Sequence, residues 1–268
     1  MPRLILLGSG GPVPLPERWG TSFLLEIGDE WLMIDCGPAS TYKMYQMSIP
    51  CTRIEHLFFT HYHSDHMSDY ACFLMTRFDM SIGVEGDLNV YGPPPIKDIT
   101  ERLWGKDKGV FWLDVVARMR HPMSVREYHR RGGEGPRPEP VVNVYECRGG
   151  KIASGKSWEC YAYEVDHAQP YLESQGYRFE TEEGVIAFTG DAEPNEKVIE
   201  LGCGADMLVI NALGGMVGAA GAAKEAGASG LTVVHQPYGI SPAEAVDEAR
   251  RLFSGQVYAA EDMVEIQW

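Results

Sequence analysis

The sequence has no apolar run long enough to cross a membrane, since none approaches the roughly 18 residues that a spanning helix requires. The chain begins with MPRLILLGSGGP, in which a short apolar run ends at glycines. That run is too short for the core of a signal peptide and fits a first β-strand better. We therefore expect a cytoplasmic protein with no membrane partner.

Paired cysteines are also missing. The six cysteines are scattered along the chain without a CxxC pair, and several lie among apolar residues. This distribution predicts buried, reduced thiols rather than a disulfide framework or a cysteine-based metal site.

Basic residues are the minority, with 23 lysines and arginines against 38 acidic residues and a formal net charge of −15. Such a charge repels polyanions, whereas nucleic-acid-binding proteins usually carry a basic stripe. The nearest candidate is REYHRRGG at 126–133, which is short and typical of a solvated helix end. The charge therefore disfavours nucleic acid as a partner and favours a small-molecule substrate.

Short apolar stretches bounded by turn residues predict a chain rich in strands. We expect strands at 3–8, 22–28, 31–37, 56–61, 88–95, 141–147, 159–165, 176–181, 185–191, 206–211, 231–235 and 256–266, and helices at 39–47, 68–79, 217–227 and 242–253. Ser64 or Asp65 could cap the helix at 68–79. Since helices separate groups of strands, we expect an α/β protein with two sheets between helical layers, in one domain of residues 1–268.

Residues 96–140 differ from their surroundings. The stretch is helical and aromatic at first and then becomes rich in glycine and proline. We interpret it as a helical insert that serves as a lid or as the contact of a homodimer. A packed helical connector is the alternative.

Four potential metal ligands fall within six residues of FFTHYHSDHMSDY, at 58–70. His61 and His63 are two apart and point the same way in an extended segment, so they can approach one ion together. Asp65 and His66 follow the turn and reach a neighbouring volume. Imidazole and carboxylate are the usual ligands of zinc, with manganese and iron as alternatives. Packing alone does not explain this cluster.

Three more potential ligands follow apolar strands in the same manner. His167 follows CYAYEVD, Asp191 follows VIAFTG and His235 follows LTVV. Strand ends in a layered α/β protein converge on one edge, where sites are usually built. Together with the cluster they give five histidines and two carboxylates, which suit two divalent ions that share one carboxylate.

The segment THYHSDH resembles the HxHxDH signature of the metallo-β-lactamase superfamily, and much of the chain is similar to its ribonuclease Z-like branch. The similar stretches are LGSGGPVPLPERWGTSFLLEIGDEWLMIDCG, GYRFETEEGVIAFTGDAEP and AKEAGASGLTVVH. The resemblance implies an αββα sandwich and a dinuclear metal-dependent hydrolase. One ion would be bound by His61, His63 and His167 and the other by Asp65, His66 and His235, with Asp191 as the bridge. A hydroxide between the ions would attack the substrate, and Asp65 would take up or relay its proton.

The resemblance is weaker where RNA chemistry is concerned. Ribonuclease-type members carry an acidic stretch near the positions of Asn211, Ala212 and Leu213, and a histidine near those of Gly214 and Gly215. This chain has no histidine between His167 and His235. We therefore expect a small organic substrate with an ester, lactone, amide or activated aryl centre. The alternatives are a phosphodiesterase or ribonuclease Z-like nuclease, and a non-catalytic metal-binding relative.

One further motif, LGSGGP at 7–12, resembles a phosphate-binding loop. Pro12 and Pro14 prevent a helix from starting there, and no lysine follows. We expect a tight loop near the active edge instead of a nucleotide site.

Overall fold

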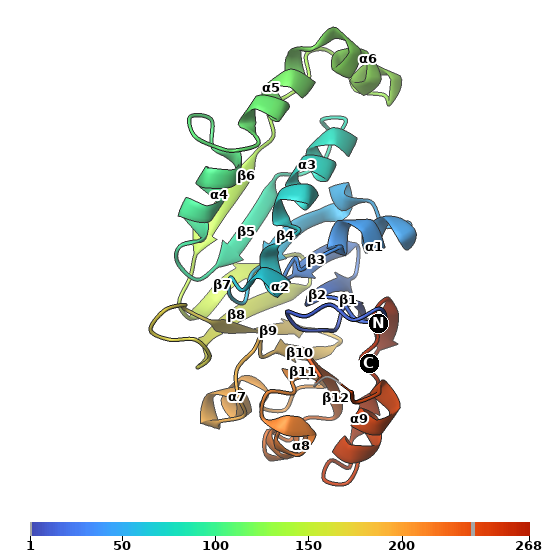
Figure 1. Ribbon diagram of the computed structural model, residues 1–268, viewed down its shortest axis with the longest axis vertical. Helices are drawn as coiled ribbons and strands as arrows, with labels where there is room; N and C mark the ends of the chain where they lie inside the picture. The colour runs from blue at the N-terminus through green and yellow to red at the C-terminus, as the bar shows by residue number, and fades with distance from the viewer. Residues whose placement is uncertain (1, 237–238) are drawn as a thin grey trace.

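The computed structural model describes residues 2–236 and 239–268. It contains two seven-stranded sheets that face each other, with helices on both outer faces (Figure 1). The four layers therefore follow the order helix, sheet, sheet, helix, as we expected from the alternation of strands and helices.

The first sheet has the order β14-β1-β2-β3-β4-β5-β6. Its strands are β1 (Arg3–Gly8), β2 (Ser22–Ile27), β3 (Glu30–Ile34), β4 (Ile54–Phe58), β5 (Leu88–Gly92), β6 (Val142–Glu146) and β14 (Val264–Gln267). Neighbouring strands from β14 to β3 are antiparallel, whereas β3, β4, β5 and β6 are parallel. Consequently β3, β4 and β5 have their carboxyl ends at the same edge.

The second sheet has the order β13-β12-β11-β10-β9-β8-β7. Its strands are β7 (Gly150–Ser154), β8 (Trp158–Glu164), β9 (Gln175–Thr181), β10 (Gly184–Phe188), β11 (Met207–Asn211), β12 (Gly230–Val234) and β13 (Gln256–Tyr258). Strands β7 to β10 form an antiparallel meander, and β10 to β13 are parallel. Since β8, β10, β11 and β12 all run in the same direction, their carboxyl ends lie along one edge.

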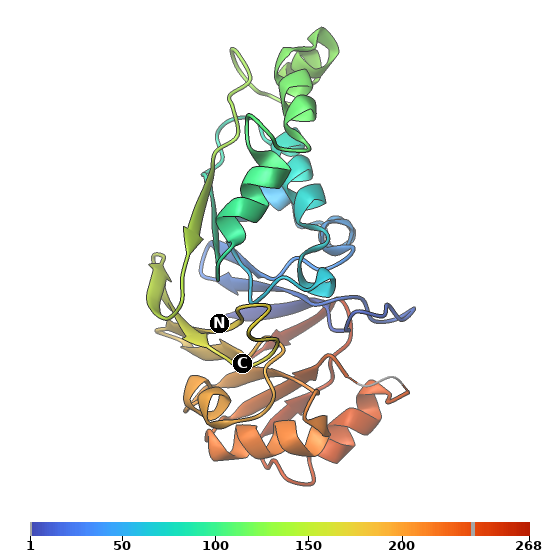
Figure 2. The ribbon, with the colours of Figure 1, turned by 60° about the vertical axis from the view of Figure 1, so that its left-hand side comes forward.

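The helices divide between the two outer faces. Those of the first sheet are α1 (Ser40–Gln46), α2 (Ser64–Met67), α3 (Tyr70–Met80), α4 (Ile96–Trp104), α5 (Trp112–Arg120) and α6 (Pro122–Arg130); those of the second are α7 (Glu196–Leu201), α8 (Gly215–Glu225) and α9 (Pro242–Ala249). Helices α5 and α6 extend beyond the sheet as an arm (Figure 2). Every helix of the described chain is too short or too polar to be a membrane span.

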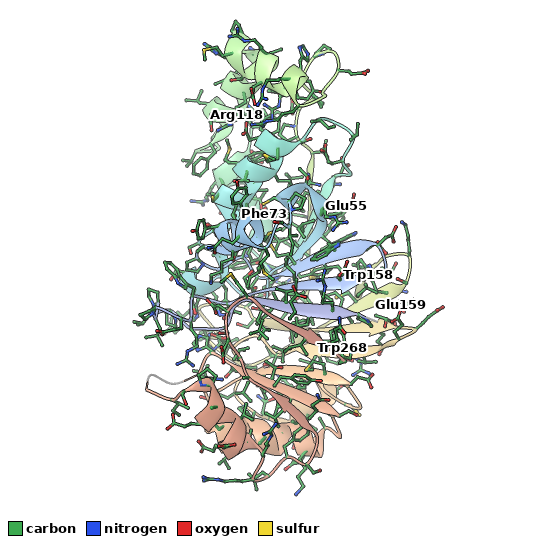
Figure 3. The ribbon with its side chains drawn as sticks, turned by 90° about the vertical axis from the view of Figure 1, so that its right-hand side faces the viewer. Glu55, Phe73, Arg118, Trp158, Glu159 and Trp268 are labelled. Carbon is green, nitrogen blue, oxygen red and sulfur yellow. The ribbon has the colours of Figure 1, made fainter. Side chains whose placement is uncertain are left out.

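Three buried clusters hold the layers together. The cluster between the sheets contains Phe58, Phe179 and Trp158, and the other two lie between each sheet and its helices. Figure 3 labels Trp158 and also Phe73, which is buried in the helix layer of the first sheet. Each fully buried aromatic or aliphatic side chain contributes about 1.5–3 kcal/mol of hydrophobic free energy. Burial of these clusters therefore stabilises the packing of both sheets.

Most of the expected elements are present, with ends that differ by a few residues. Strand β7 and helix α7 were not expected. The expected cap was wrong: α3 begins after Asp69, and Ser64 and Asp65 belong to the separate short helix α2. The short helix α2 forms a single turn that includes His66. The longer helix α3 therefore begins only after this turn, at Tyr70.

Candidate metal centre

The seven expected ligands lie at the edge where the strand ends of both sheets converge. His61 and His63 follow β4, and Asp65 and His66 lie in α2. The remaining three, His167, Asp191 and His235, follow β8, β10 and β12 respectively. Figure 1 shows α2 beside the loops of the second sheet. Parallel strand directions thus bring together residues that are more than 170 positions apart in the sequence.

The seven side chains form two groups in which all potential ligand atoms lie within 4.8 Å of one another. The first group contains His61, His63, His167 and Asp191, and the second contains Asp65, His66, Asp191 and His235. Asp191 belongs to both groups and is therefore the only shared residue among these seven.

The distances suit metal coordination. The Nδ1 atom of His63 lies 3.1 Å from Nε2 of His61 and 3.1 Å from Nε2 of His167. Two imidazole nitrogens bound tetrahedrally to one zinc ion at about 2.0–2.1 Å would be separated by roughly 3.3 Å. In the second group, Nε2 of His235 lies 3.2 Å from Oδ2 of both Asp65 and Asp191.

A buried atom without a partner supports the same interpretation. His66 is fully buried, and among the described residues its Nε2 atom makes no hydrogen bond, although Oδ2 of Asp191 lies 3.3 Å away. A buried nitrogen that lacks a partner is costly. The donor set and this nitrogen both fit a divalent cation in the second group.

The carboxylates of the second group make its environment strongly negative. Burial lowers the pKa of His66, but Asp191 and Asp35 raise it well above its ordinary value. Burial also lowers the pKa of His235, and its hydrogen bonds to Asp191 and Asp65 raise it to about 9. Burial raises the pKa of Asp191, but His66 and His235 lower it well below its usual range. Clustered carboxylates thus create a potential that a divalent cation would neutralise.

Asp35 orients two of the candidate ligands from behind. Its fully buried carboxylate accepts hydrogen bonds from Nδ1 of His66 at 2.7 Å and from the backbone N–H and hydroxyl of Thr60, each at 2.8 Å. The Thr60 hydroxyl also lies 3.0 Å from Nδ1 of His61. This carboxylate therefore fixes the ring of His66 directly and that of His61 through Thr60, as outer partners of metal ligands usually do.

Asn211 holds the segment that carries Asp191. Its buried side-chain amide donates to the backbone carbonyls of Gly190 at 2.9 Å and Ala192 at 2.5 Å, and its carbonyl oxygen accepts from the N–H of Leu213. Both neighbours of Asp191 are thus tied to the end of β11. Gly214 and Gly215 follow as the start of α8, without an imidazole.

The site also contains three residues that we did not expect there from the sequence: Asp35, Thr60 and Asn211. A signal for Asp35 was present, because it ends the apolar stretch WLMID in the same way as Asp191 ends VIAFTGD. The three remaining histidines lie outside the two groups. His56 packs among aromatic rings, His121 precedes α6, and His129 lies within α6 with Nε2 2.8 Å from the carbonyl of Gly135.

Comparisons with known proteins agree with this architecture. The family model described as anti-Pycsar protein Apyc1 matches residues 2–105. A ribonuclease Z from Mycobacterium bovis (strain BCG / Pasteur 1173P2) is 25% identical over 210 residues, which cover 78% of this chain and 69% of the relative.

Several solved structures are similar over almost the whole chain. The metallo-β-lactamase fold protein YhfI from Bacillus subtilis has a TM-score of 0.77 with 18% identity and covers 99% of this chain and 98% of its own. The short form of human tRNase Z, ELAC1, has a TM-score of 0.69 with 19% identity and the same coverage. A diphosphatase of the PhnP family has a TM-score of 0.69 with 16% identity and covers 100% and 98%.

The fold is the metallo-β-lactamase fold, and the two ligand groups together with the similarity to ribonuclease Z indicate a metal-dependent hydrolase. Among the curated relatives, the chain is similar in sequence to ribonuclease Z, and its fold is shared with a tRNase Z.

Proposed function

We propose that this protein hydrolyses phosphodiesters with two divalent metal ions, zinc in the first place and manganese or iron as alternatives. The observation that carries the proposal is the pair of ligand groups that share Asp191. His61, His63 and His167 would bind one ion, and Asp65, His66 and His235 the other. Carboxylate and imidazole ligands in these numbers suit a two-metal hydrolytic site.

When bound, two divalent ions supply an activated water and a counter-charge for the developing oxyanion. The chain's own residues would then handle the proton and the geometry. Asp65 is mostly buried beside His235 and would accept the proton of the attacking water. Asp35 and Asn211 would keep the ligand side chains in place while charge moves through the site.

Phosphodiesters replace the small organic esters that we expected from the sequence. The named relatives include ribonuclease Z, tRNase Z and a diphosphatase, which support a phosphorus-centred substrate and make a nucleic-acid substrate plausible. The net charge of −15 and the glycines at 214 and 215 favour a small phosphodiester over a folded RNA. A net negative charge does not repel neutral compounds, so neutral esters and lactones are the second candidate class of substrate.

A substrate panel tests the proposal. The metal-loaded protein would be assayed on bis(p-nitrophenyl) phosphate, cyclic nucleotides, a tRNA precursor, aryl esters, lactones and haloaromatics. We expect turnover of at least one small phosphodiester, slow or absent tRNA cleavage, and loss of turnover in Asp191→Ala. Turnover confined to esters, lactones or haloaromatics would overturn the proposal in favour of the second candidate.

We further propose that the protein acts in the cytoplasm and that residues 96–140 are an insert in one domain that supports a homodimer. Leu113 and Met123 on the arm are 82% and 64% exposed, which leaves apolar surface for a second copy. Sedimentation analysis of the full chain tests the homodimer. A monomer at micromolar concentration would argue against it.

A further inference from the structure

Asp262, just before β14, ties together both ends of the loop at residues 9–20. Its Oδ1 atom accepts hydrogen bonds from the backbone N–H of Ser9 at 2.8 Å and from the Ser9 hydroxyl at 2.9 Å. Its Oδ2 atom accepts from the backbone N–H of Trp19 at 2.9 Å and from Nζ of Lys43 at 2.5 Å. The side chains of Lys43 and Asp262 are each 6% exposed, so this ion pair is shielded from water.

The first end of the loop packs against the metal-centre residue His235. The N–H of His235 donates to the carbonyl of Ser9 at 2.8 Å. Gly11 lies so close to the imidazole that a Cβ atom there would be 2.6 Å from Cε1 of His235. His235 also has a φ of 55°, a strained conformation that persists only where its surroundings enforce it. The loop supplies that enforcement.

The second end of the loop packs against Asp65. A Cβ atom on Gly20 would lie 2.5 Å from the backbone oxygen of Asp65, so the two backbones are in close contact. The two ends are also joined directly, because the N–H of Gly10 donates to the carbonyl of Trp19 at 2.7 Å. A displacement of one end therefore moves the other.

The two residues that the loop touches belong to the same ligand group. Asp65 and His235 both lie in the second group, with His66 and Asp191. His61, His63 and His167 of the first group are carried by segments that follow β4 and β8. The Asp262 network is thus connected to one half of the metal centre.

We propose that Asp262, paired with Lys43, is a positioning residue for the second ion: it holds the 9–20 loop against His235 and Asp65. The inference rests on the proposed two-metal centre. Direct outer partners of metal ligands typically change metal affinity by 10–100-fold when they are replaced. Asp262 acts one contact further out, through Ser9 and Trp19, so we expect an effect at the low end of that range. Charge-assisted hydrogen bonds of this kind are the strong ones, so loss of the carboxylate should loosen both loop ends.

Zinc titration of the full-length protein with a competing chelator tests this inference. We expect wild type to bind two ions, and Asp262→Asn to bind one of them at least about tenfold more weakly while the other changes less than about twofold. Gly11→Ala should act in the same direction, because its methyl group pushes on His235 without touching the ion pair. Glu261→Gln is the matched control, since Glu261 is an exposed neighbour of Asp262, and should leave both affinities unchanged.

The outcomes separate this inference from the proposed function. Wild type that never binds more than one ion would overturn the two-metal centre itself. Two ions in wild type, with equal affinities in Asp262→Asn or equal weakening of both ions, would overturn the positioning role alone. If Asp262→Asn does not fold by circular dichroism, Ser9→Ala decides, because it removes the 2.9 Å hydrogen bond to Asp262 without adding atoms near His235. Unchanged binding of the second ion would then refute the inference, and selective weakening would support it.

Discussion

Asp35→Asn should weaken metal binding although Asp35 is not a metal ligand. The carboxylate accepts three hydrogen bonds, two of them on Oδ2 from His66 and the Thr60 hydroxyl, and one on Oδ1 from the Thr60 N–H. An amide has a single oxygen. If this oxygen keeps the bonds made by Oδ2, the new NH₂ group faces the N–H of Thr60, and two donors oppose each other.

The magnitude follows from the bonds that are lost. One charge-assisted hydrogen bond disappears, and a buried N–H is left without an acceptor, which together cost about 2–4 kcal/mol of folding stability. His66 and, through Thr60, His61 also lose their fixed orientation. We expect metal affinity to fall by about 10–100-fold, which corresponds to about 1.4–2.7 kcal/mol of binding free energy.

The assay combines urea unfolding of the metal-free protein with zinc titration of the folded protein. Asp206→Asn is the matched control, because Asp206 accepts the backbone N–H of Val185 at the opposite end of β10. The control should keep both its stability and its zinc affinity, because Asp206 is exposed and the oxygen of an asparagine can still accept this single bond. If Asp35→Asn loses stability while binding zinc as tightly as wild type, the carboxylate supports only the fold, and our account of ligand orientation is wrong.

Four further outcomes are expected. Asp191→Ala should abolish turnover and release metal, whereas Glu193→Ala, at an exposed neighbouring position, should change kcat/KM by less than about threefold; equal losses would mean that the bridge is misplaced. His121→Ala and His129→Ala should keep the metal content of wild type by elemental analysis, and loss of an ion would show that residues 96–140 donate a ligand. Asn211→Asp should destabilise the fold by about 2–4 kcal/mol, because a carboxylate would face two carbonyl oxygens; unchanged thermal unfolding would contradict this. Chelation should lower the unfolding midpoint and added zinc should restore it, since ions that bind only the folded state stabilise it; an unchanged midpoint would argue against tight binding.

Spacing along the chain predicted seven candidate ligands, and the structure brings these seven residues together into two groups. His61, His63, Asp65 and His66 are close in sequence, so local geometry alone places them together. His167, Asp191 and His235 were found because each ends an apolar run, and parallel strands deliver their ends to one edge. The αββα layering followed from the same alternation of runs, because each apolar face must be buried against another layer.

Weak local patterns explain what was missed in the fold. Strand β7 (GKIAS) lies at the edge of its sheet and is mostly exposed, so no apolar alternation marks it. Helix α7 has only six residues, too few for a helical period, and its one signal is the Asn195 cap. Neither element changes the position of the site.

Only the tertiary structure showed which residues hold the ligands in place. Asp35 meets His66 across 31 positions, and Asp262 meets Ser9 across 253 positions. Which partner a buried polar side chain meets depends on how the two sheets and their loops pack. No local sequence pattern encodes that packing. The histidine and aspartate spacing predicts a metal site because coordination depends on residue type. The orientation of the candidate ligand side chains depends on long-range contacts. These contacts form only when the fold brings β1, β12 and the end of the chain together.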